Sequence, residues 1–327
     1  MATKPVTPKK AEKFLQEEIK DHHQILTNKI IEKMEEAVKY EKPWVEAVSL
    51  PYNPQTGSHY KGINLMSLLV AGYVDNRFFT FNGIKTMALE TGENIHVKKG
   101  EKGIPVFKAL QQTFTKTDEA SGEESRFGIW KQVYAGTVFN ASQIEGLPKD
   151  NTPQIAHFET HDELKQIMDA MIQKSGLKIE HANIASAFYT QDKDKVVLPE
   201  KENFKSEAHY YRTLMHELVH STGHPSRLDR KLKNSFGSVD YSKEELVAEL
   251  GSYFMGAHLG LPYDGAVHEN HAAYLKSWLK ILKEDKNAIF KASSAASKAV
   301  EFQLSLKNEF LNQPEVTTET KKIKLNM

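Results

Sequence analysis

The chain has 327 residues, of which 39% are hydrophobic and 26% are charged, as is typical of a globular protein long enough to form two domains. It contains no cysteine, which excludes disulfides and thiolate metal sites and leaves histidine and carboxylate side chains as metal ligands. Lysine and arginine together number 43, as do aspartate and glutamate, so any nucleic-acid binding must come from local basic patches.

Membrane-spanning and secretory segments are not expected in this sequence. No stretch approaches the roughly 18 consecutive apolar residues of a transmembrane helix. The N-terminal stretch MATKPVTPKKAEKF is basic but runs into a charged helix without an apolar core, unlike a secretory signal. We therefore expect no membrane partner, and the absence of cysteine fits a reducing cytoplasm.

Residues 1–145 are predicted to form a compact α+β domain. Three helices are predicted from apolar residues at helical spacing, over residues 11–41, 63–70 and 84–89. The third is expected to be opened by Asn82 and closed around Gly92.

The strands of this domain are predicted from short apolar runs, at residues 95–97, 104–107 and 129–139. The turn KKGEKG is expected to join the first two strands as a pair. The acidic stretch TKTDEASGEESR, residues 115–126, is expected to be an exposed loop.

Aromatic and basic side chains are interleaved between Trp44 and Lys108, a mixture that suits single-stranded nucleic acid. Such strands are held by aromatic rings that stack on bases and by lysine and arginine side chains that follow the phosphates. The residues predicted to contact DNA, single-stranded first and double-stranded second, are Trp44, Tyr60, Lys61, Arg77, Phe79, Lys98, Lys99 and Lys102. The alternative is that the aromatic rings form the domain core and the lysine-rich turn is only solvated.

A linker is predicted at residues 146–160, because the stretch EGLPKDNTPQ carries two prolines and a glycine and has no apolar periodicity. A second, mostly helical domain with a small sheet is expected over residues 161–312, followed by a disordered tail at residues 313–327. Its elements are predicted as helices at residues 161–174, 272–283 and 292–306 and a hairpin of residues 187–190 and 195–198. This hairpin is the candidate for a strand that pairs with an extended peptide.

The stretch LMHELVHSTGH, residues 214–224, contains the pattern HExxH. On a helix, His216 and His220 stand one turn apart on nearly the same face, so both imidazoles can bind one metal ion. Glu217 projects roughly 100° away from His216, where its carboxylate can touch a metal-bound water without being a ligand. The pattern predicts a Zn²⁺ site, with Mn²⁺ or another divalent metal as the alternative, and Glu217 as the catalytic base.

The residues around this pattern favour a helix. Ser206 is a suitable N-cap, Leu214 and Leu218 fall where a helix buries its inner face, and Gly223 ends the helix. The alternative is a pair of histidines on an ordinary half-buried helix.

A third protein ligand is needed to complete such a site. The metzincin pattern is excluded because Ser226 occupies the position of its third histidine, and His224 is expected to be a turn residue. Downstream, in YSKEELVAELGSYF, Ser242 and Glu245 are expected to form a capping box at a helix start. Glu249 is therefore preferred over Glu245 as the third ligand, since its small neighbours would let this helix approach the HELVH helix closely.

The reaction predicted from these residues is hydrolysis of a peptide bond by a Zn²⁺-bound water, with Glu217 as general base and then general acid. No oxyanion stabiliser is identified from the sequence. The nearby candidates are Tyr189, Tyr210, Tyr211 and Arg227.

Longer stretches carry a family resemblance. YEKPW, NPQTGSHYKGINLMSL, RFFTFNG, HVKKGEKGIPVF and VFNASQIEGLP resemble the N-terminal domain of the ArdC-type antirestriction proteins of conjugative plasmids and phages. VVLP, HELVHSTGHPSRLDR and KEELVAELGSYF are similar to the zincin-like metallopeptidase domain of that family.

The resemblance implies a bacterial protein whose first domain binds DNA, especially single strands, and which protects incoming plasmid DNA from restriction. It implies that the second domain coordinates a divalent metal, with His216, Glu217, His220 and Glu249 at the positions of the metal motif.

Three functions remain open from the sequence. The first is a DNA-binding antirestriction metalloprotease. The second is a DNA-binding protein whose metal site is structural and which protects DNA by covering it. The third is a cytoplasmic metalloprotease that acts on regulatory or DNA-bound proteins.

Overall fold

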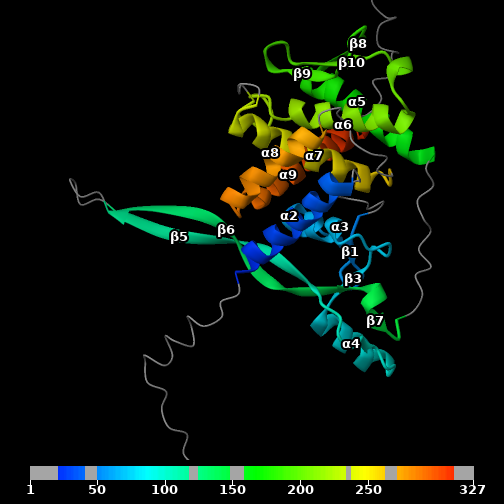
Figure 1. The fold of residues 1–327 in the computed structure, drawn as a ribbon, viewed down its shortest axis with the longest axis vertical. Coiled ribbons are helices and arrows are strands. Elements are labelled where there is room, and N and C mark those ends of the chain that lie inside the picture. Colours follow the sequence, from blue (N-terminus) through cyan, green and yellow to red (C-terminus); the bar gives the residue numbers. More distant parts are fainter. Residues whose placement is uncertain are drawn as a thin grey trace, which may run out of the picture. The chain divides into compact units, whose positions relative to one another are not determined.

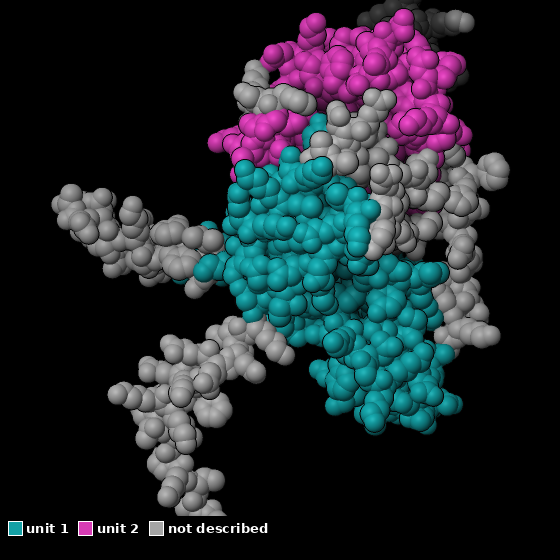
Figure 2. All heavy atoms as spheres, viewed as in Figure 1, with its two compact units in different colours: residues 1–150, 268–294 teal, residues 151–267, 295–327 magenta. Residues whose placement is uncertain are grey.

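The chain divides into two units, which Figure 2 colours separately. One comprises residues 1–150 and 268–294, and the other residues 151–267 and 295–327. Each combines helices with small sheets, which confirms the predicted two-domain α+β fold (Figure 1). The computed structural model describes residues 21–40, 50–117, 124–147, 158–232, 237–261 and 271–312.

The described helices of the first unit include α2 (His22–Tyr40), α3 (Gly62–Val70), α4 (Phe81–Thr91) and α8 (His271–Glu284). The three helices predicted in the first half are confirmed over their described residues. The cap of α4 is Thr80 rather than the predicted Asn82, because the Thr80 side chain accepts a backbone hydrogen bond in the first turn. Gly92 ends this helix with a φ of 70°, a conformation that favours glycine.

Residues 268–294 lie in the first unit, although the sequence predicts them in the second domain. In this unit α8 packs against α2. Thr27 of α2 is fully buried and donates from its hydroxyl to the carbonyl of Lys286, just beyond α8, over 2.8 Å. The apolar face of α8 is thus used within the first unit.

The first unit contains a three-stranded antiparallel sheet of order β3-β6-β5, formed by Phe78–Thr80, Glu124–Asn140 and Ile104–Thr117. β5 and β6 pair along their whole length, whereas β3 pairs only with the last three residues of β6. Beyond that point β5 and β6 run on as a two-stranded ribbon (Figure 1). The predicted loop over residues 115–126 is wrong at both ends, because residues 115–117 and 124–126 continue this ladder.

Two smaller sheets are each built from two strands: β1 (Tyr52–Asn53) with β2 (Ser58–His59), and β4 (His96–Val97) with β7 (Ile144–Glu145). The predicted pairing of residues 95–97 with 104–107 is therefore wrong. The side chain of Gln143, in the turn η1 (Ala141–Gln143), donates to the carboxylate of Glu101 and the carbonyl of Lys102. These bonds hold the KKGEKG segment against η1, so β4 runs alongside β7 while β5 pairs with β6.

The second unit contains α5 (Phe158–Ser175), α6 (Glu207–Ser221), α7 (Val239–His258) and the last part of α9 (Ala288–Leu311). Its sheet has the order β8-β10-β9, formed by Lys178–Ala182, Lys195–Pro199 and Phe188–Thr190. β10 is parallel to β8 and antiparallel to β9. The predicted hairpin is therefore confirmed, and β9 is an outer strand of the sheet.

Some predictions fall outside the described residues. They concern residues 11–20 of the first helix, most of the linker, and the tail at residues 313–327. α5 begins at Phe158, three residues before its predicted start and inside the predicted linker. No helix in the described ranges is long and apolar enough to cross a membrane.

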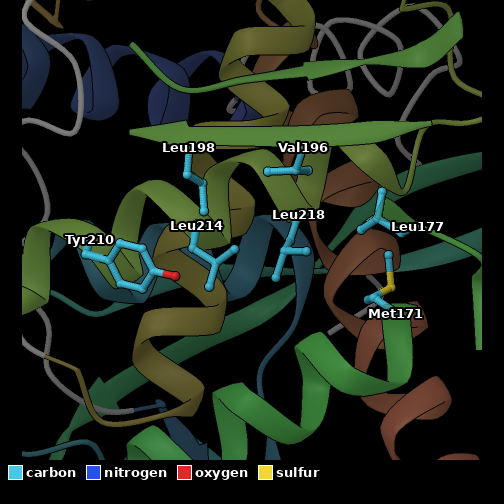
Figure 3. Close-up of a cluster of buried hydrophobic side chains, with 7 residues drawn as sticks. All are labelled: Met171, Leu177, Val196, Leu198, Tyr210, Leu214 and Leu218. Carbon is cyan, nitrogen blue, oxygen red and sulfur yellow. The ribbon is translucent and has the colours of Figure 1, made fainter. Parts of the chain in front are cut away.

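A buried cluster of seven side chains forms a core of the second unit (Figure 3). Its members come from the stretch between α5 and α6: Met171, Leu177, Val196, Leu198, Tyr210, Leu214 and Leu218. Figure 3 shows Leu214 and Leu218 of α6 facing the side chains of β10. His216 and His220 come two residues after these leucines, roughly 200° further round the helix, so they face away from the cluster.

α7 lies beside α6 and begins earlier than predicted. Its N-cap is Ser238, whose hydroxyl accepts a hydrogen bond from the Tyr241 amide over 3.1 Å. Ser242 and Glu245 lie inside the helix, and both are buried. The predicted capping box is therefore wrong, and the Glu245 carboxylate is available for another role.

The predicted close approach of α6 and α7 is confirmed at Gly251. A Cβ atom at this position would lie 2.7 Å from Cγ2 of Val219 on α6. Only glycine leaves room for Val219 here, and this contact brings the glutamates of α7 level with the histidines of α6.

Candidate metal centre

The HELVH segment forms the C-terminal half of α6. The helix starts where predicted, since the Ser206 hydroxyl accepts a hydrogen bond from the His209 amide over 3.0 Å. His216 and His220 are turned toward each other, with 3.1 Å between their Nε2 atoms. The side chain of His216 is 2% exposed and that of His220 is 13% exposed. The two imidazoles thus share one largely buried site.

A carboxylate from α7 completes this pair. One oxygen of Glu245 lies 3.6 Å from Nε2 of His216, and the other lies 3.5 Å from Nε2 of His220. One ligand atom from each of the three residues can be chosen so that all lie within 4.8 Å of one another. In a tetrahedral site with metal–ligand bonds of roughly 2.0–2.2 Å, ligand atoms are separated by distances of this order.

Both histidines have a second carboxylate behind them. Nδ1 of His216 lies 3.6 Å from Glu249, and Nδ1 of His220 lies 3.2 Å from Glu244. The guanidinium of Arg230 donates to both oxygens of Glu244, over 2.8 and 3.1 Å. Carboxylates in this position fix the ring orientation and the tautomer of metal-binding histidines.

This arrangement decides which ring nitrogens are acceptors. With the Nδ1 protons facing Glu249 and Glu244, the Nε2 lone pairs of both neutral imidazoles converge on the Glu245 carboxylate. Three electron-rich atoms this close repel one another unless a cation lies among them. The donor set of two imidazoles and one carboxylate is the set that a divalent transition-metal ion such as Zn²⁺ prefers, so the residues fit the metal.

The pKa shifts of the two histidines and of Glu245 also favour a bound cation. Burial acts to lower the pKa of His216 and His220, but the nearby carboxylates of Glu245, with Glu249 and Glu244 respectively, outweigh it and raise the pKa of both. Burial likewise opposes ionisation of Glu245, but the two histidines beside it hold the pKa of its carboxyl well below the usual range. The cluster is thus built to hold positive charge, and protons compete with a metal ion for it.

Glu217 is buried next to the three ligand atoms, on the same helix as the histidines. Burial raises the pKa of its carboxyl, although the neighbouring His216 and His220 act to lower it. The backbone amide of Tyr189, on the outer strand β9, also acts to lower it. Burial thus shifts the pKa of this carboxyl toward the range in which a carboxylate works as a base.

The structure changes the prediction for the third ligand. The sequence favours Glu249, whereas the atoms that converge with both Nε2 atoms belong to Glu245. Glu249 lies one turn further along α7, behind the ring of His216. Glu244 and Arg230 are missing from the prediction, and no spacing signal in the sequence singles them out.

The candidate oxyanion residues all have other partners. The hydroxyl of Tyr189 donates to Asp194, and Arg227 forms an ion pair with the same carboxylate. Tyr210 bonds through its hydroxyl to a histidine ring outside the metal site, and Tyr211 to Glu207. The polar groups of all four side chains are therefore engaged elsewhere, and none is assigned as an oxyanion stabiliser.

The residues predicted to bind DNA differ in their burial and in their partners. Trp44 lies outside the described residues. Phe79 is 3% exposed and belongs to a core cluster, so its prediction as a stacking residue is wrong. Tyr60 is half-buried against the ring of Phe78, and burial raises the pKa of its hydroxyl to about 12. Arg77 is ion-paired with Asp75 at 2.8 Å.

The lysines of the prediction are exposed on the first unit. Lys98, Lys99 and Lys102 lie in one turn around Gly100, and Lys61 lies at the start of α3. Lys98 also donates to the carbonyl of Ser142 over 2.8 Å. The basic part of the prediction is thus on the surface, whereas its described aromatic part is largely in the core.

Two known domain families match the chain. The family described as the N-terminal domain of anti-restriction factor ArdC matches residues 20–139, and the family of zincin-like metallopeptidases matches residues 166–295.

Curated relatives extend over most of the chain. It is 36% identical over 314 residues to the DNA primase TraC of Escherichia coli and 35% identical over 305 residues to a second TraC primase of that species. The chain spans only 28% and 20% of the lengths of these two primases. It is also 31% identical to the uncharacterized protein y4eC of Sinorhizobium fredii (strain NBRC 101917 / NGR234), over 86% of the chain and 91% of that relative.

Solved structures of one protein are similar over both units. The metal-free crystal structure of the antirestriction protein ArdC from plasmid R388 has a TM-score of 0.66 and 34% identity, over 88% of this chain and 98% of that one. Its Mn(II)-bound structure has a TM-score of 0.63 and 33% identity over the same shares.

Proposed function

Because the chain belongs to the family of ArdC-type antirestriction proteins, we propose that it protects incoming plasmid or phage DNA from restriction in the cytoplasm of a bacterial cell. In this proposal the first unit binds DNA, with a preference for single strands, and the second unit is a divalent-metal-dependent peptidase that acts on a protein found at that DNA.

The observation that carries the peptidase assignment is the convergence of His216, His220 and Glu245 beside the buried carboxylate of Glu217. When bound, a divalent cation would supply Lewis acidity, which polarises a carbonyl group and lowers the pKa of water. We propose Zn²⁺ for this role, with Mn²⁺ as the alternative because a relative has been crystallised with Mn(II).

Residues of the chain itself would then carry out the proton transfers and bind the peptide. Glu217, with its pKa raised by burial, takes a proton from the attacking water and delivers it to the leaving amine. The main chain of Tyr189 lies close to this carboxylate. Since β9 is an outer strand beside Glu217, an extended peptide can add to its open edge and reach the site.

Support for DNA binding comes from the family and from the exposed lysine turn of residues 98–102. Lysines that contact phosphates displace counterions, and each contact with a single strand contributes roughly 0.7 to the slope of log affinity against log salt. Replacing Lys98, Lys99 and Lys102 with glutamine is therefore expected to weaken oligonucleotide binding and to flatten its salt dependence.

The decisive experiment uses Glu217→Gln, which keeps the shape of the side chain. Proteolysis of a labelled denatured protein should fall by roughly 10²–10⁴-fold, while metal content and DNA affinity stay unchanged. Protection of incoming DNA in a restricting recipient should be lost with it. Glu207→Gln, in the exposed first turn of the same helix, serves as the matched control.

Two other functions give different results in this experiment. If the protein protects DNA only by covering it, Glu217→Gln protects as well as the natural protein. If it is a protease for unrelated cytoplasmic proteins, the unaltered protein shows no salt-sensitive binding to oligonucleotides.

A further inference from the structure

Trp130 stands on the ribbon of β5 and β6 with its side chain in solvent. It is 66% exposed, and it has no ring or hydrogen-bond partner among the described residues. A tryptophan side chain is a large flat ring that stacks well on other flat rings, so one left this open on a regular strand can receive a partner.

The other exposed aromatic rings among the described residues of the first unit are already engaged. Tyr134 stacks on His22 of α2, with ring centroids 3.8 Å apart and planes 6° from parallel. Phe81 on α4 lies against Phe139, and the ammonium group of Lys85 sits 4.9 Å from its ring centroid. Trp130 is therefore the ring best placed to receive a new stacking partner.

The base of the ribbon is fixed by α2, so Trp130 is carried on an anchored element. Nε2 of His23 bonds to the carbonyl of Gln132 over 2.8 Å, and the ring of His23 stacks on Phe290. Trp130, Gln132 and Tyr134 alternate onto one face of β6. Trp130 lies on this face directly beyond the residues that contact α2.

The charge around Trp130 selects the kind of partner. In the adjoining parts of the ribbon, residues 107–113 and 128–135, the sequence holds two lysines and no acidic residue, although the chain as a whole is neutral. Both lysines, Lys108 and Lys131, are exposed on the face opposite the tryptophan, next to the exposed Leu110. An acid-free basic strand pair with an open aromatic ring suits a polyanion that carries flat apolar rings.

We propose that this ribbon is a stacking platform for single-stranded DNA, with Trp130 stacking on a base on one face and Lys108 and Lys131 reaching phosphates where the same strand passes round the narrow ribbon to the opposite face. This inference rests on the DNA-binding part of the proposed function. A single strand is favoured over a duplex because the tryptophan needs an unpaired base whose face is open. A protein partner is disfavoured because the residues beside Trp130 on its face are the polar Gln111 and Gln132.

The test measures the binding of a fluorescent oligo-dT, long enough to cover a site of about 4–16 nucleotides, by fluorescence anisotropy. Trp130→Ala should weaken binding by roughly 5- to 150-fold, whereas Trp130→Phe, which keeps a stacking ring, should retain most of the affinity. Lys131→Gln should reduce the salt slope by roughly 0.7. Phe188→Ala, which removes an exposed aromatic ring from the second unit, should leave the affinity for the oligonucleotide unchanged.

Each other outcome has a definite meaning. If Trp130→Ala melts normally and binds as well as the natural protein, or if Phe188→Ala loses as much affinity, the platform is not on this ribbon. If a duplex of the same length binds more tightly than the single strand, single-stranded DNA is not the preferred ligand of the ribbon. If the natural protein binds no DNA at all, the DNA-binding part of the proposed function fails, and this inference fails with it.

Discussion

At the residue scale, the four buried or half-buried carboxylates around the histidines have distinct positions. Glu245 faces both Nε2 atoms, Glu249 and Glu244 stand behind the Nδ1 atoms, and Glu217 is buried on the same helix as the histidines. All four are carboxylates, so only their positions distinguish the proposed metal ligand from the proposed orienting groups and from the proposed base.

Metal affinity is expected to follow these positions. Glu245→Ala should weaken Zn²⁺ or Mn²⁺ binding by more than about 100-fold, because it removes one of three ligands. Glu249→Gln and Glu244→Gln should each cost only roughly 10–100-fold, since they disturb the ring orientation of one histidine. Isothermal titration with each metal checks this order, and a larger loss in Glu249→Gln than in Glu245→Ala would restore Glu249 as the ligand.

The hairpin next to the site offers a second residue-scale prediction. Asp194 pairs with Arg227, whose side chain is 1% exposed, and accepts a hydrogen bond from Tyr189. Burial acts to raise the pKa of Asp194, but the bonds from Arg227 and Tyr189 outweigh it, so the pKa lies below its ordinary value of 3.8. A carboxyl whose pKa is depressed in the folded state stabilises the protein above the ordinary pKa and loses that contribution as pH falls below it.

Asp194→Asn is therefore expected to lower stability at neutral pH by about 1–3 kcal/mol, because the buried guanidinium loses its charged partner. The difference in unfolding free energy between this variant and the natural protein should shrink as pH is lowered through 3.8 and below. Asparagine tolerates the left-handed backbone at this position, where φ is 46°, so the substitution adds no backbone strain. Urea melts at several pH values measure it, and a pH-independent difference would show that the carboxylate charge is not the cause.

At the element scale, the position of α7 against α6 decides which glutamate reaches the histidines. The contact between Gly251 and Val219 sets the separation of the two helices. Gly251→Ala is expected to cost about 1–3 kcal/mol, because the added Cβ overlaps a stiff β-branched side chain. The same variant should weaken metal binding, since it moves Glu245 away from the ring nitrogens.

Gly256→Ala on the same helix is the matched control. Its added Cβ would meet nothing closer than 3.8 Å, so the only expected effect is a small gain in stability from the higher helix propensity of alanine. Combining Gly251→Ala with Val219→Ala should recover part of the lost metal affinity. If Gly251→Ala melts and binds metal like the natural protein, the helix separation is not fixed at this point.

The elements also show how far the sequence can predict this site. The HELVH helix, its Ser206 cap and the hairpin follow from local patterns and are confirmed. The third ligand does not follow from them, because Ser238 and Ser242 are both plausible caps and only the former is used. Glu245 and Glu249 share one face of α7, so the choice between them depends on how far α7 is shifted along α6, which no local pattern encodes.

The strand pairing of the first unit likewise depends on contacts between residues far apart in the sequence. β4 and β5 are separated by a turn-like stretch, but β4 pairs with β7, about fifty residues later in the chain, and β5 with β6. A local turn signal predicts a hairpin, whereas the side chain of Gln143 and the long β5–β6 ladder decide the outcome. Composition also misplaces the aromatic contacts, since it does not separate a core ring such as Phe79 from an exposed one such as Trp130.

At the scale of the whole molecule, the two units are expected to respond differently to metal removal. A metal that binds only the folded state at 100 times its dissociation constant contributes about 2.7 kcal/mol to stability. Chelation should therefore lower the melting temperature of the second unit by roughly 5–10 °C.

The same treatment should leave oligonucleotide affinity unchanged, because all the ligand candidates lie in the second unit. Calorimetry and anisotropy on one chelated sample check both statements. Re-addition of Zn²⁺ serves as the control, and an unchanged melting temperature would indicate that the site holds no tightly bound metal.

The two parts of Tyr189 serve different neighbours, which has a consequence for how this protein can vary. Its backbone amide acts on the carboxyl of Glu217, and every residue except proline carries such an amide. Its hydroxyl bonds to Asp194 and Arg227 instead. A change of side chain at position 189 is therefore expected to disturb the hairpin while it leaves a main-chain amide beside Glu217.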